Sequence, residues 1–276
     1  MEEMQNQDAP KMSSIEENQE EQELSHTDKL VGLFTEPQNT YGKISKFPAK
    51  TVDWILPVFV MIVVIILGQF VLRTNAEIRQ QQKEKGLQQI EKNFDEAVKK
   101  GQMTRDQADE QMARIEDNME QGNAFQAIGL IVGTPIVMFI VFFVISGFFL
   151  LVTKFGLKGA GTYKDVMVAY GLPHYIGSIG YIIMVIISMA MSKLMVGISV
   201  ADFMGMEKST ITGFILGKLD IVSIWFYFIF GIGLAKMNKS DDIKKYVITV
   251  FAVWIIFGLL FFYIAKAVPF LSAFAG

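Results

Sequence analysis

The chain has 276 residues, of which 51% are hydrophobic and 19% charged, and its formal net charge at pH 7 is −3. The apolar residues come in long blocks, which is typical of helical membrane proteins and argues against a soluble globular domain. The slight acidic excess argues against a nucleic-acid partner, and the absence of cysteine excludes disulfides, thiol catalysis and thiolate metal sites.

Residues 1–28 are rich in Glu, Gln and Asn and poor in aromatic residues. A segment of this composition buries too little apolar surface to offset the conformational entropy that it would lose on ordering. We therefore expect a disordered acidic N-terminal tail, in which His26 is solvated and has no role.

Residues 29–53 form an amphipathic juxtamembrane segment. Its short apolar run is expected to end at Glu36, because Pro37 disfavours a helical conformation for the residue before it. A segment of this kind, followed by lysines, is suited to lie along lipid headgroups, and a plain linker is the alternative. The candidate docking residues on it are Leu33, Phe34, Glu36 and Pro37.

The stretch 54–72 has no charged side chain and predicts the first transmembrane helix. At about 1.5 Å rise per residue, a helix of this length covers roughly the 30 Å hydrocarbon core of a bilayer. Lipid offers the backbone no hydrogen-bond partners, so the segment must be helical.

Residues 73–123 are polar and carry two apolar stripes at helical spacing. Between the stripes, Gly101 is placed as a helix C-cap, and Thr104 with Gln107 has the spacing of a capping box. These signals predict an extramembrane helical hairpin whose arms cover each other's stripes, as in a coiled coil.

Residues 124–276 are expected to hold four further spans. The second covers 125–152, with a kink expected at Pro135 and a Gly129–Gly133 pair suited to close helix contact. The third starts between Val166 and His174, where Pro173 marks its first turn or a kink, and runs to about Ser192.

The mixed stretch 193–210 suits an interfacial segment, and the apolar stretch 221–235 that follows is only about 22 Å long as a helix. Starting this fourth span at Ile211 gives it enough length and places Lys218 and Asp220 inside it. The fifth span covers 246–265. The sequence thus predicts an all-α polytopic membrane protein with five transmembrane helices and one polar hairpin.

Five spans place the termini on opposite sides of the membrane. The tight connection 236–245 carries four lysines, and positively charged short loops face the cytoplasm. We therefore expect a protein of the cell (inner) membrane with a cytoplasmic N-terminus and its C-terminus on the opposite side.

Three ionisable residues are candidates for a polar site in the third and fourth spans: Lys218, Asp220 and His174. Ionisable groups within spans are costly and are often functional. The structural alternatives are that Lys218 reaches the headgroups, that Asp220 caps a helix beginning there, and that His174 bonds a nearby carbonyl. No nucleophile-and-base set, phosphate loop or metal-ligand spacing occurs, so we expect no enzyme activity, cofactor or metal.

Three segments carry a family resemblance: LVGLFTEPQNTYGKI before a span that opens with DWILP, GTYKDVMVAYGLPHYIG, and LDIVSIWFYFIFGIGLAK. In this order they resemble the Yip family of membrane proteins, the Ypt/Rab-interacting group, and the inserted hairpin resembles that of bacterial-type members. The resemblance implies five transmembrane helices, a cytoplasmic N-terminus and no catalytic residues. Eukaryotic members act in vesicle trafficking through small GTPases, but no recognisable GTPase-contact sequence is present.

The function that we expect is a non-enzymatic scaffold or adaptor. Its partners would be the lipid bilayer and other membrane proteins, or itself as a homo-oligomer. The alternative is a transporter or channel for a small solute or lipid, in which the polar residues of the third and fourth spans line a path.

Overall fold

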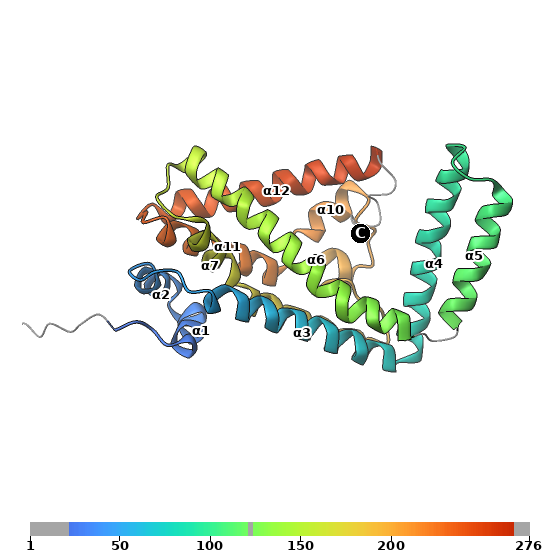
Figure 1. Ribbon diagram of the computed structural model, residues 1–276, viewed down its shortest axis with the longest axis horizontal. Coiled ribbons are helices and arrows are strands. Elements are labelled where there is room, and N and C mark those ends of the chain that lie inside the picture. Colours follow the sequence, from blue (N-terminus) through green and yellow to red (C-terminus); the bar gives the residue numbers. More distant parts are fainter. Residues whose placement is uncertain (1–21, 121–123, 268–276) are drawn as a thin grey trace, which may run out of the picture.

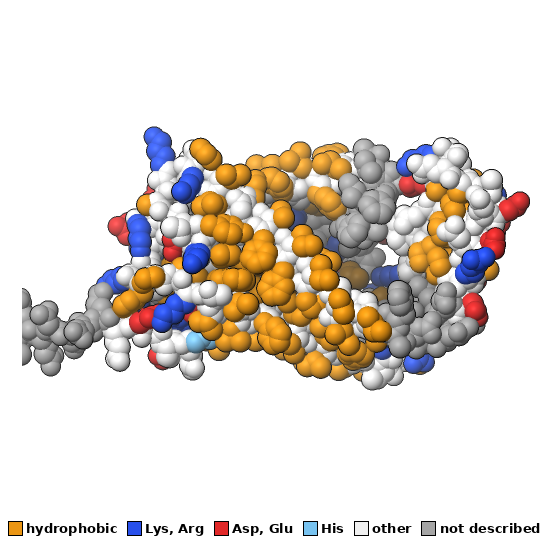
Figure 2. Space-filling model, viewed as in Figure 1, with side chains coloured by type: hydrophobic (Ala, Val, Ile, Leu, Met, Phe, Trp, Pro, Cys, Tyr) orange, Lys and Arg blue, Asp and Glu red, His pale blue; other side chains and the backbone are white. Residues whose placement is uncertain are grey.

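The computed structural model describes residues 22–120 and 124–267. Within these ranges every regular element is a helix, and the long apolar helices run roughly along the longest axis of the molecule (Figure 1). Figure 2 shows hydrophobic side chains covering the middle of the molecule, with charged side chains gathered toward its two ends. This distribution fits a bundle whose middle lies in the hydrocarbon core of a bilayer.

The predicted all-α polytopic fold is confirmed. Four helical runs are long and apolar enough to cross a membrane, and a bent helix pair raises the number to as many as five. The spans are formed, in chain order, by α3 (Val52–Thr74), α6 (Ala124–Leu151) with the π-helical turn η1 (Val152–Leu157), α7 (Tyr163–Gly171) with α8 (His174–Met191), α10 (Ile211–Gly217) with α11 (Ile221–Met237), and α12 (Ile243–Ala267).

The third span is made of two helices, because α7 ends at Gly171 and α8 begins at His174, with Pro173 at its N-cap. Both helices belong to one run that is long and apolar enough to cross the membrane. A proline suits the start of a helix, where its missing N–H leaves no intrahelical bond unmade. Pro135, in contrast, lies inside α6, which continues past it.

The fourth span is broken. Helices α10 and α11 meet at an angle of 62° across residues 218–220. Starting the span at Ile211 is confirmed as the beginning of α10, but the two pieces do not form one straight rod. The connection before them, which the sequence marks as interfacial, contains one short helix, α9 (Val200–Phe203).

The hairpin consists of α4 (Ala76–Lys99) and α5 (Arg105–Glu120), and it lies across one end of the bundle (Figure 1). Gly101 follows α4 with a φ of +67°, a conformation that glycine adopts without strain. The side chains of Thr104 and Gln107 bond each other's backbone N–H groups. The predicted cap and capping box are therefore confirmed.

The N-terminal helices α1 (His26–Thr35) and α2 (Pro37–Ile44) are the largest correction to the sequence-based expectations. Order begins before residue 28, and His26 is not free in solvent, since its ring bonds the Tyr175 hydroxyl at 2.8 Å and lies 3.3 Å from a carboxylate oxygen of Asp53. The expectation of a solvated His26 is wrong. Pro37 does end α1 at Thr35, but it also begins α2.

Apolar side chains of this N-terminal pair pack against the protein's own spans. Leu33 is fully buried, and the Phe34 ring meets the Trp225 ring edge to face at 5.3 Å. Of the candidate docking residues, Glu36 is exposed at the corner between α1 and α2, and Pro37 is partly exposed beside it. Leu33 and Phe34 thus pack against other residues of the same chain.

One buried ion pair fixes the N-terminal pair to the first span. The Lys29 ammonium lies 2.7 Å from the Asp53 carboxylate, and both side chains are almost fully buried. Glu23 adds an outer contact to Lys29 at 3.4 Å and bonds Lys50 at 2.6 Å, and the hydrogen bond from Lys50 lowers the pKa of Glu23. Breaking such a pair leaves a buried charge without its partner, which costs far more than losing an exposed pair.

We predict that Asp53→Ala destabilises the protein by about 3 kcal/mol, because the buried Lys29 ammonium loses its short ion pair and keeps only the longer contact to Glu23. Thermal unfolding of the detergent-solubilised protein checks this. The Lys29→Met/Asp53→Leu double variant should be close to wild type, and Lys50→Ala, at an exposed pair, should cost about 1 kcal/mol or less. Equal losses for Asp53→Ala and Lys50→Ala would contradict the role of the pair.

Candidate functional site

Asp220 lies at the break in the fourth span and caps α11. Its carboxylate accepts a hydrogen bond from the backbone N–H of Val222 at 3.0 Å and a second from the Ser223 hydroxyl. An N-cap side chain satisfies one of the N–H groups that the first turn of a helix leaves unpaired. This confirms the structural alternative for Asp220 that the sequence offers.

Lys218 points away from Asp220, toward α12. Its ammonium lies 4.7 Å from the centre of the Trp254 ring and 5.2 Å from that of Phe214. Trp254 lies 11 residues after Ile243, or about 17 Å along α12, so the ammonium lies beside the middle of that span and does not reach its end. Aromatic faces attract a cation, and among the described side chains Lys218 has no carboxylate partner.

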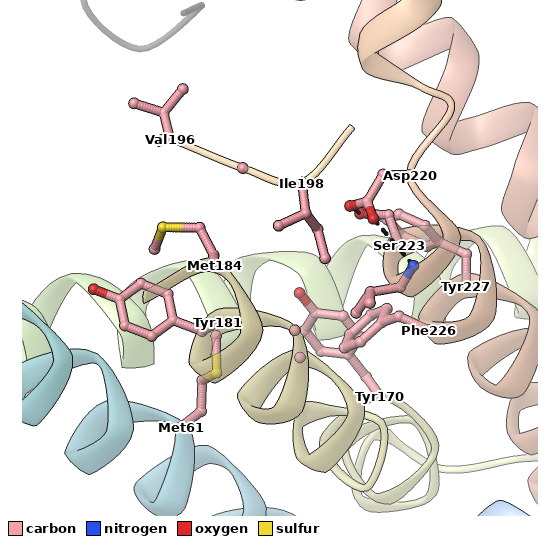
Figure 3. A pocket seen from close by; sticks show the side chains of 14 residues that line it. Met61, Tyr170, Tyr181, Met184, Val196, Ile198, Asp220, Ser223, Phe226 and Tyr227 are labelled. Atoms are coloured by element: carbon pink, nitrogen blue, oxygen red, sulfur yellow. Dashed lines mark hydrogen bonds between the residues drawn. The ribbon is translucent and has the colours of Figure 1, made fainter. Parts of the chain in front are cut away.

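A cleft of about 330 Å³ opens beside Asp220 (Figure 3). Figure 3 shows Asp220, Ser223 and Phe226 of α11 on one side of it, with Tyr181 and Met184 of α8 on the other. Val196 and Ile198 of the connection before α9 lie over it, and Met61 and Tyr170 lie below. The Tyr181 hydroxyl is already engaged, because it accepts a hydrogen bond from the Gln69 amide at 2.8 Å.

His174 does not line this cleft. It is buried, and its Nδ1 lies 3.0 Å from the carbonyl oxygen of Tyr170 and 3.1 Å from that of Gly171. The rings of Phe142, Tyr170 and Phe226 surround it in edge-to-face contacts. The alternative in which His174 bonds a nearby carbonyl is confirmed, and its ring joins three helices of the bundle.

The three ionisable candidates therefore do not converge. Asp220 lines the cleft, Lys218 lies against α12, and His174 lies in an aromatic cluster outside the cleft. Among the described residues, no group of three or more His, Asp or Glu side chains is placed to hold a metal ion. The Asp220 carboxylate accepts two hydrogen bonds, and the residue that lines the cleft and also contacts the His174 ring is Tyr170.

A polar cluster that the sequence did not reveal centres on Asn238, which is 3% exposed. Its side chain accepts a hydrogen bond from the N–H of Gly161 at 3.0 Å and donates one to the carbonyl of Leu234 at 2.8 Å. The Ala160 N–H donates to the Asn238 carbonyl oxygen at 3.4 Å. Asn238 thus ties the loop before α7 to the end of α11. The glycines at 159 and 161 leave room for the Asn238 side chain, since a Cβ on either would lie within 3 Å of its oxygen.

At the opposite end of the bundle, Asp202 holds the connection before α10. Burial alone would raise the pKa of Asp202, but the hydrogen bond from Ser199 and the ion pair with Lys208 at 2.9 Å keep it below its usual value. Asp202 and Ser199 also form the capping box of α9. The Asp202 carboxylate is therefore charged when it makes the contacts with Ser199 and Lys208 that hold the connection before α10.

Comparison with protein families assigns the fold. The family model for the Yip1 domain matches residues 31–264. The chain belongs to the Yip1 family. No curated protein and no solved structure matches the chain. The match begins inside α1 and ends inside α12, so the second half of α1, all of α2 and the hairpin fall within the Yip1 domain of this protein.

The segments that resemble other Yip proteins are places where helices approach closely. A Cβ on Gly171 would lie 2.6 Å from the backbone Cα of Trp54, and one on Gly231 would lie 2.7 Å from that of Val247. A Cβ on Gly233 would lie 2.6 Å from the Tyr41 ring, whose hydroxyl donates to the carbonyl of Ala169 at 3.1 Å. Small residues allow such contacts between membrane helices. These Yip1 segments build the bundle.

We predict that Asp220→Ala destabilises the Yip1 domain by about 1 kcal/mol, because the first turn of α11 loses its cap, whereas Asp220→Asn stays near wild type. Thermal unfolding in detergent compares the two variants. Equal damage from both would show that the negative charge, and not the hydrogen-bond acceptor, is what matters at this position.

Proposed function

We propose that this Yip1-family protein is a non-enzymatic membrane scaffold or adaptor that binds other membrane proteins through its extramembrane hairpin. The observation that carries the proposal is the specific docking of the hairpin on the bundle. The Gln81 side chain donates to the carbonyl of Ser192 at 3.1 Å and accepts from the N–H of Leu194 at 2.8 Å. The Asn75 amide also bonds the Ser192 hydroxyl at 3.0 Å.

Apolar packing supports the same docking. Ile78 of α4 is fully buried and belongs to the same apolar cluster as Leu72 of α3, Met184 of α8 and Met195 of the connection that follows α8. Packed interiors resist deformation, so α4 holds a fixed position on the bundle. An adaptor needs this property, because a surface that is already ordered loses less entropy when a partner binds.

The hairpin helix that lies farther from the bundle is α5 (Figure 1). Most of its exposed charged side chains are acidic. The exposed carboxylates are those of Asp106, Asp109, Glu110, Glu116 and Asp117, against the two cations Arg105 and Arg114. Charge of one sign speeds association with a surface of opposite charge and selects among partners. We therefore infer that the partner presents a basic surface to α5.

A second surface for partners is the face of α6 that carries Gly129 and Gly133. A Cβ on either glycine would meet no heavy atom within 4 Å, so no other part of the described chain covers this face. Small residues at this spacing suit close contact with another membrane helix. The helix would come from another membrane protein or from a second copy of the chain.

The alternative function is a transporter or channel, and the cleft beside Asp220 is the observation that favours it. A transporter needs polar groups that face a path and change partners during transport. Here Lys218 and His174 lie outside the cleft, and Asp220 is held by Val222 and Ser223. The geometry therefore supports the scaffold better.

We further propose that the protein lies in the cell membrane with α1, α2 and the connection 238–242 in the cytoplasm. The Asn238 cluster supports placing the connections before α7 and before α12 on one side, because it joins them directly. The exposed lysines Lys239, Lys244 and Lys245 lie at this end, and lysines are enriched in cytoplasmic loops.

We predict that single cysteines at the two ends are labelled from opposite sides of the membrane. Gln102→Cys at the tip of the hairpin should react with an impermeant maleimide on intact cells, and Lys244→Cys should react only after permeabilisation. Both sites are exposed, and the chain has no cysteine of its own. Labelling of Lys244→Cys on intact cells would overturn the orientation.

We also predict that shortening the hairpin removes partner binding without unfolding the bundle. Replacing residues 88–113 by a short Gly-Ser linker keeps Asn75, Ile78 and Gln81, which dock the hairpin. The variant should lose the membrane proteins that co-purify with the wild type after crosslinking.

A matched control changes only charge at the other end of the molecule. The double variant Lys244→Gln/Lys245→Gln should keep the same co-purifying proteins as the wild type. Retention of every partner by the shortened variant would contradict the adaptor role of the hairpin. Solute flux into proteoliposomes that is abolished by Asp220→Asn would support the transporter instead.

A further inference from the structure

A second cavity, of about 550 Å³, lies between the hairpin and the C-terminal end of α12. It is lined by α4, by the connection between α8 and α10, and by the last turns of α12. Figure 1 shows that α4, and not α5, is the hairpin helix nearer the bundle. The cavity is separate from the cleft at Asp220, although Val196 lines both.

The polar wall of this cavity is basic. Four lysines line it, Lys85 and Lys92 from α4 and Lys193 and Lys208 from the connection, against two acids, Asp202 and Glu207. The Lys208 ammonium is paired with Asp202 at 2.9 Å. Among the described side chains, no carboxylate lies within 4.0 Å of the ammonium groups of Lys85, Lys92 or Lys193. Three cations thus face one cavity without a carboxylate partner in the described part of the chain.

The remaining wall is apolar and comes mainly from the spans and from the connection that follows α8. Leu194, Val196 and Met206 line it from the connection, and Phe262 and Ala265 line it from α12. A site with cations on one side and apolar groups on the other matches a ligand that has both an anionic and an apolar part.

The depth of the cavity indicates what this ligand is. Phe262 lies 19 residues after Ile243, or about 29 Å along α12, which is close to the roughly 30 Å thickness of the hydrocarbon core. If α12 enters the core near its first residue, Phe262 lies at the opposite boundary, where lipid phosphates are found. Basic pockets between membrane helices on the cytoplasmic side of a membrane bind anionic lipid headgroups. The same charge complementarity applies at this boundary, which lies opposite the proposed cytoplasmic end.

We propose that this cavity binds the phosphate headgroup of an anionic glycerophospholipid, with Lys85, Lys92 and Lys193 holding the phosphate and the acyl chains lying along α12. The lipid bridges α4 and the connection after α8 by giving their like charges a shared counter-ion. The site is independent of the partner surface proposed for α5, since it faces the opposite side of the hairpin.

The test measures lipid retained by the purified full chain in detergent, by native mass spectrometry, with phosphatidylglycerol and phosphatidylcholine as the probes. We expect phosphatidylglycerol to bind at least tenfold more tightly than phosphatidylcholine, and this preference to weaken as ionic strength rises. The triple variant Lys85→Gln/Lys92→Gln/Lys193→Gln should lose at least tenfold in phosphatidylglycerol affinity.

A control variant removes the same number of charges elsewhere. Lys99→Gln/Lys244→Gln/Lys245→Gln alters exposed lysines that do not line the cavity, and it should bind phosphatidylglycerol as the wild type does. Equal loss in both triple variants would overturn the site, because it would show attraction by overall charge alone.

Two outcomes with the wild-type protein also overturn the proposal, whether or not the triple variant folds. One is equal affinity for phosphatidylglycerol and phosphatidylcholine. The other is displacement of phosphatidylglycerol by millimolar inorganic phosphate, which would show that a soluble phosphate, and not a lipid, is the preferred occupant. Failure of lipid binding would leave co-purification through the hairpin unaffected, so the two proposals are tested separately.

Discussion

The constraint on which this structure depends is that a bilayer offers no hydrogen-bond partners to the groups placed in it. Many polar groups that the described part of the chain brings into or against the bundle are therefore placed where another part of the chain bonds them, although the buried Ser146 hydroxyl of α6 has no hydrogen-bond partner among the described residues. Lys29 meets Asp53, Asn238 meets Gly161, and Asp220 meets the first turn of α11. Even Lys218, which has no carboxylate, lies over the ring of Trp254.

Apart from the local cap at Asp220, these contacts join segments that are far apart in the sequence. They explain why the protein is one unit. The N-terminal pair is fixed by Lys29 and Tyr41, and burial together with the nearby Asp53 carboxylate raises the pKa of Tyr41 well above its usual value. The phenol therefore stays a neutral donor to the carbonyl of Ala169. At the other end, Gln81 and Asn75 fix the hairpin. Buried and partly buried polar residues thus hold the N-terminal pair and the hairpin on the bundle.

The sequence predicts the spans and the hairpin because their signals are local. Bilayer-length apolar runs, the glycine at 101 and the Thr104–Gln107 spacing depend on neighbouring residues only. The docking of the N-terminal pair could not be predicted in this way, since the amphipathic pattern of the juxtamembrane segment does not show that Lys29 has a partner 24 residues later. The same holds for His26, whose partners Asp53 and Tyr175 lie on two different spans.

The candidate site shows the same limit. The sequence places Lys218 and Asp220 two residues apart, but the 62° break turns their side chains to different neighbours. Helical spacing excludes a direct contact between them, yet it does not reveal that one faces α12 and the other a cleft. The basic cavity was missed because its lysines come from α4 and from the connection after α8, which meet only when the hairpin docks.

The central claim is that the polar groups of the bundle hold one fixed structure and do not alternate between states. Hydrogen–deuterium exchange of the protein in lipid nanodiscs, followed by mass spectrometry, tests this most directly. The account predicts slow exchange at α2 and at 236–240, and a single mass envelope across 196–223. Two interconverting envelopes over 196–223 would contradict it, because they would show a cleft that opens and closes as a transporter requires.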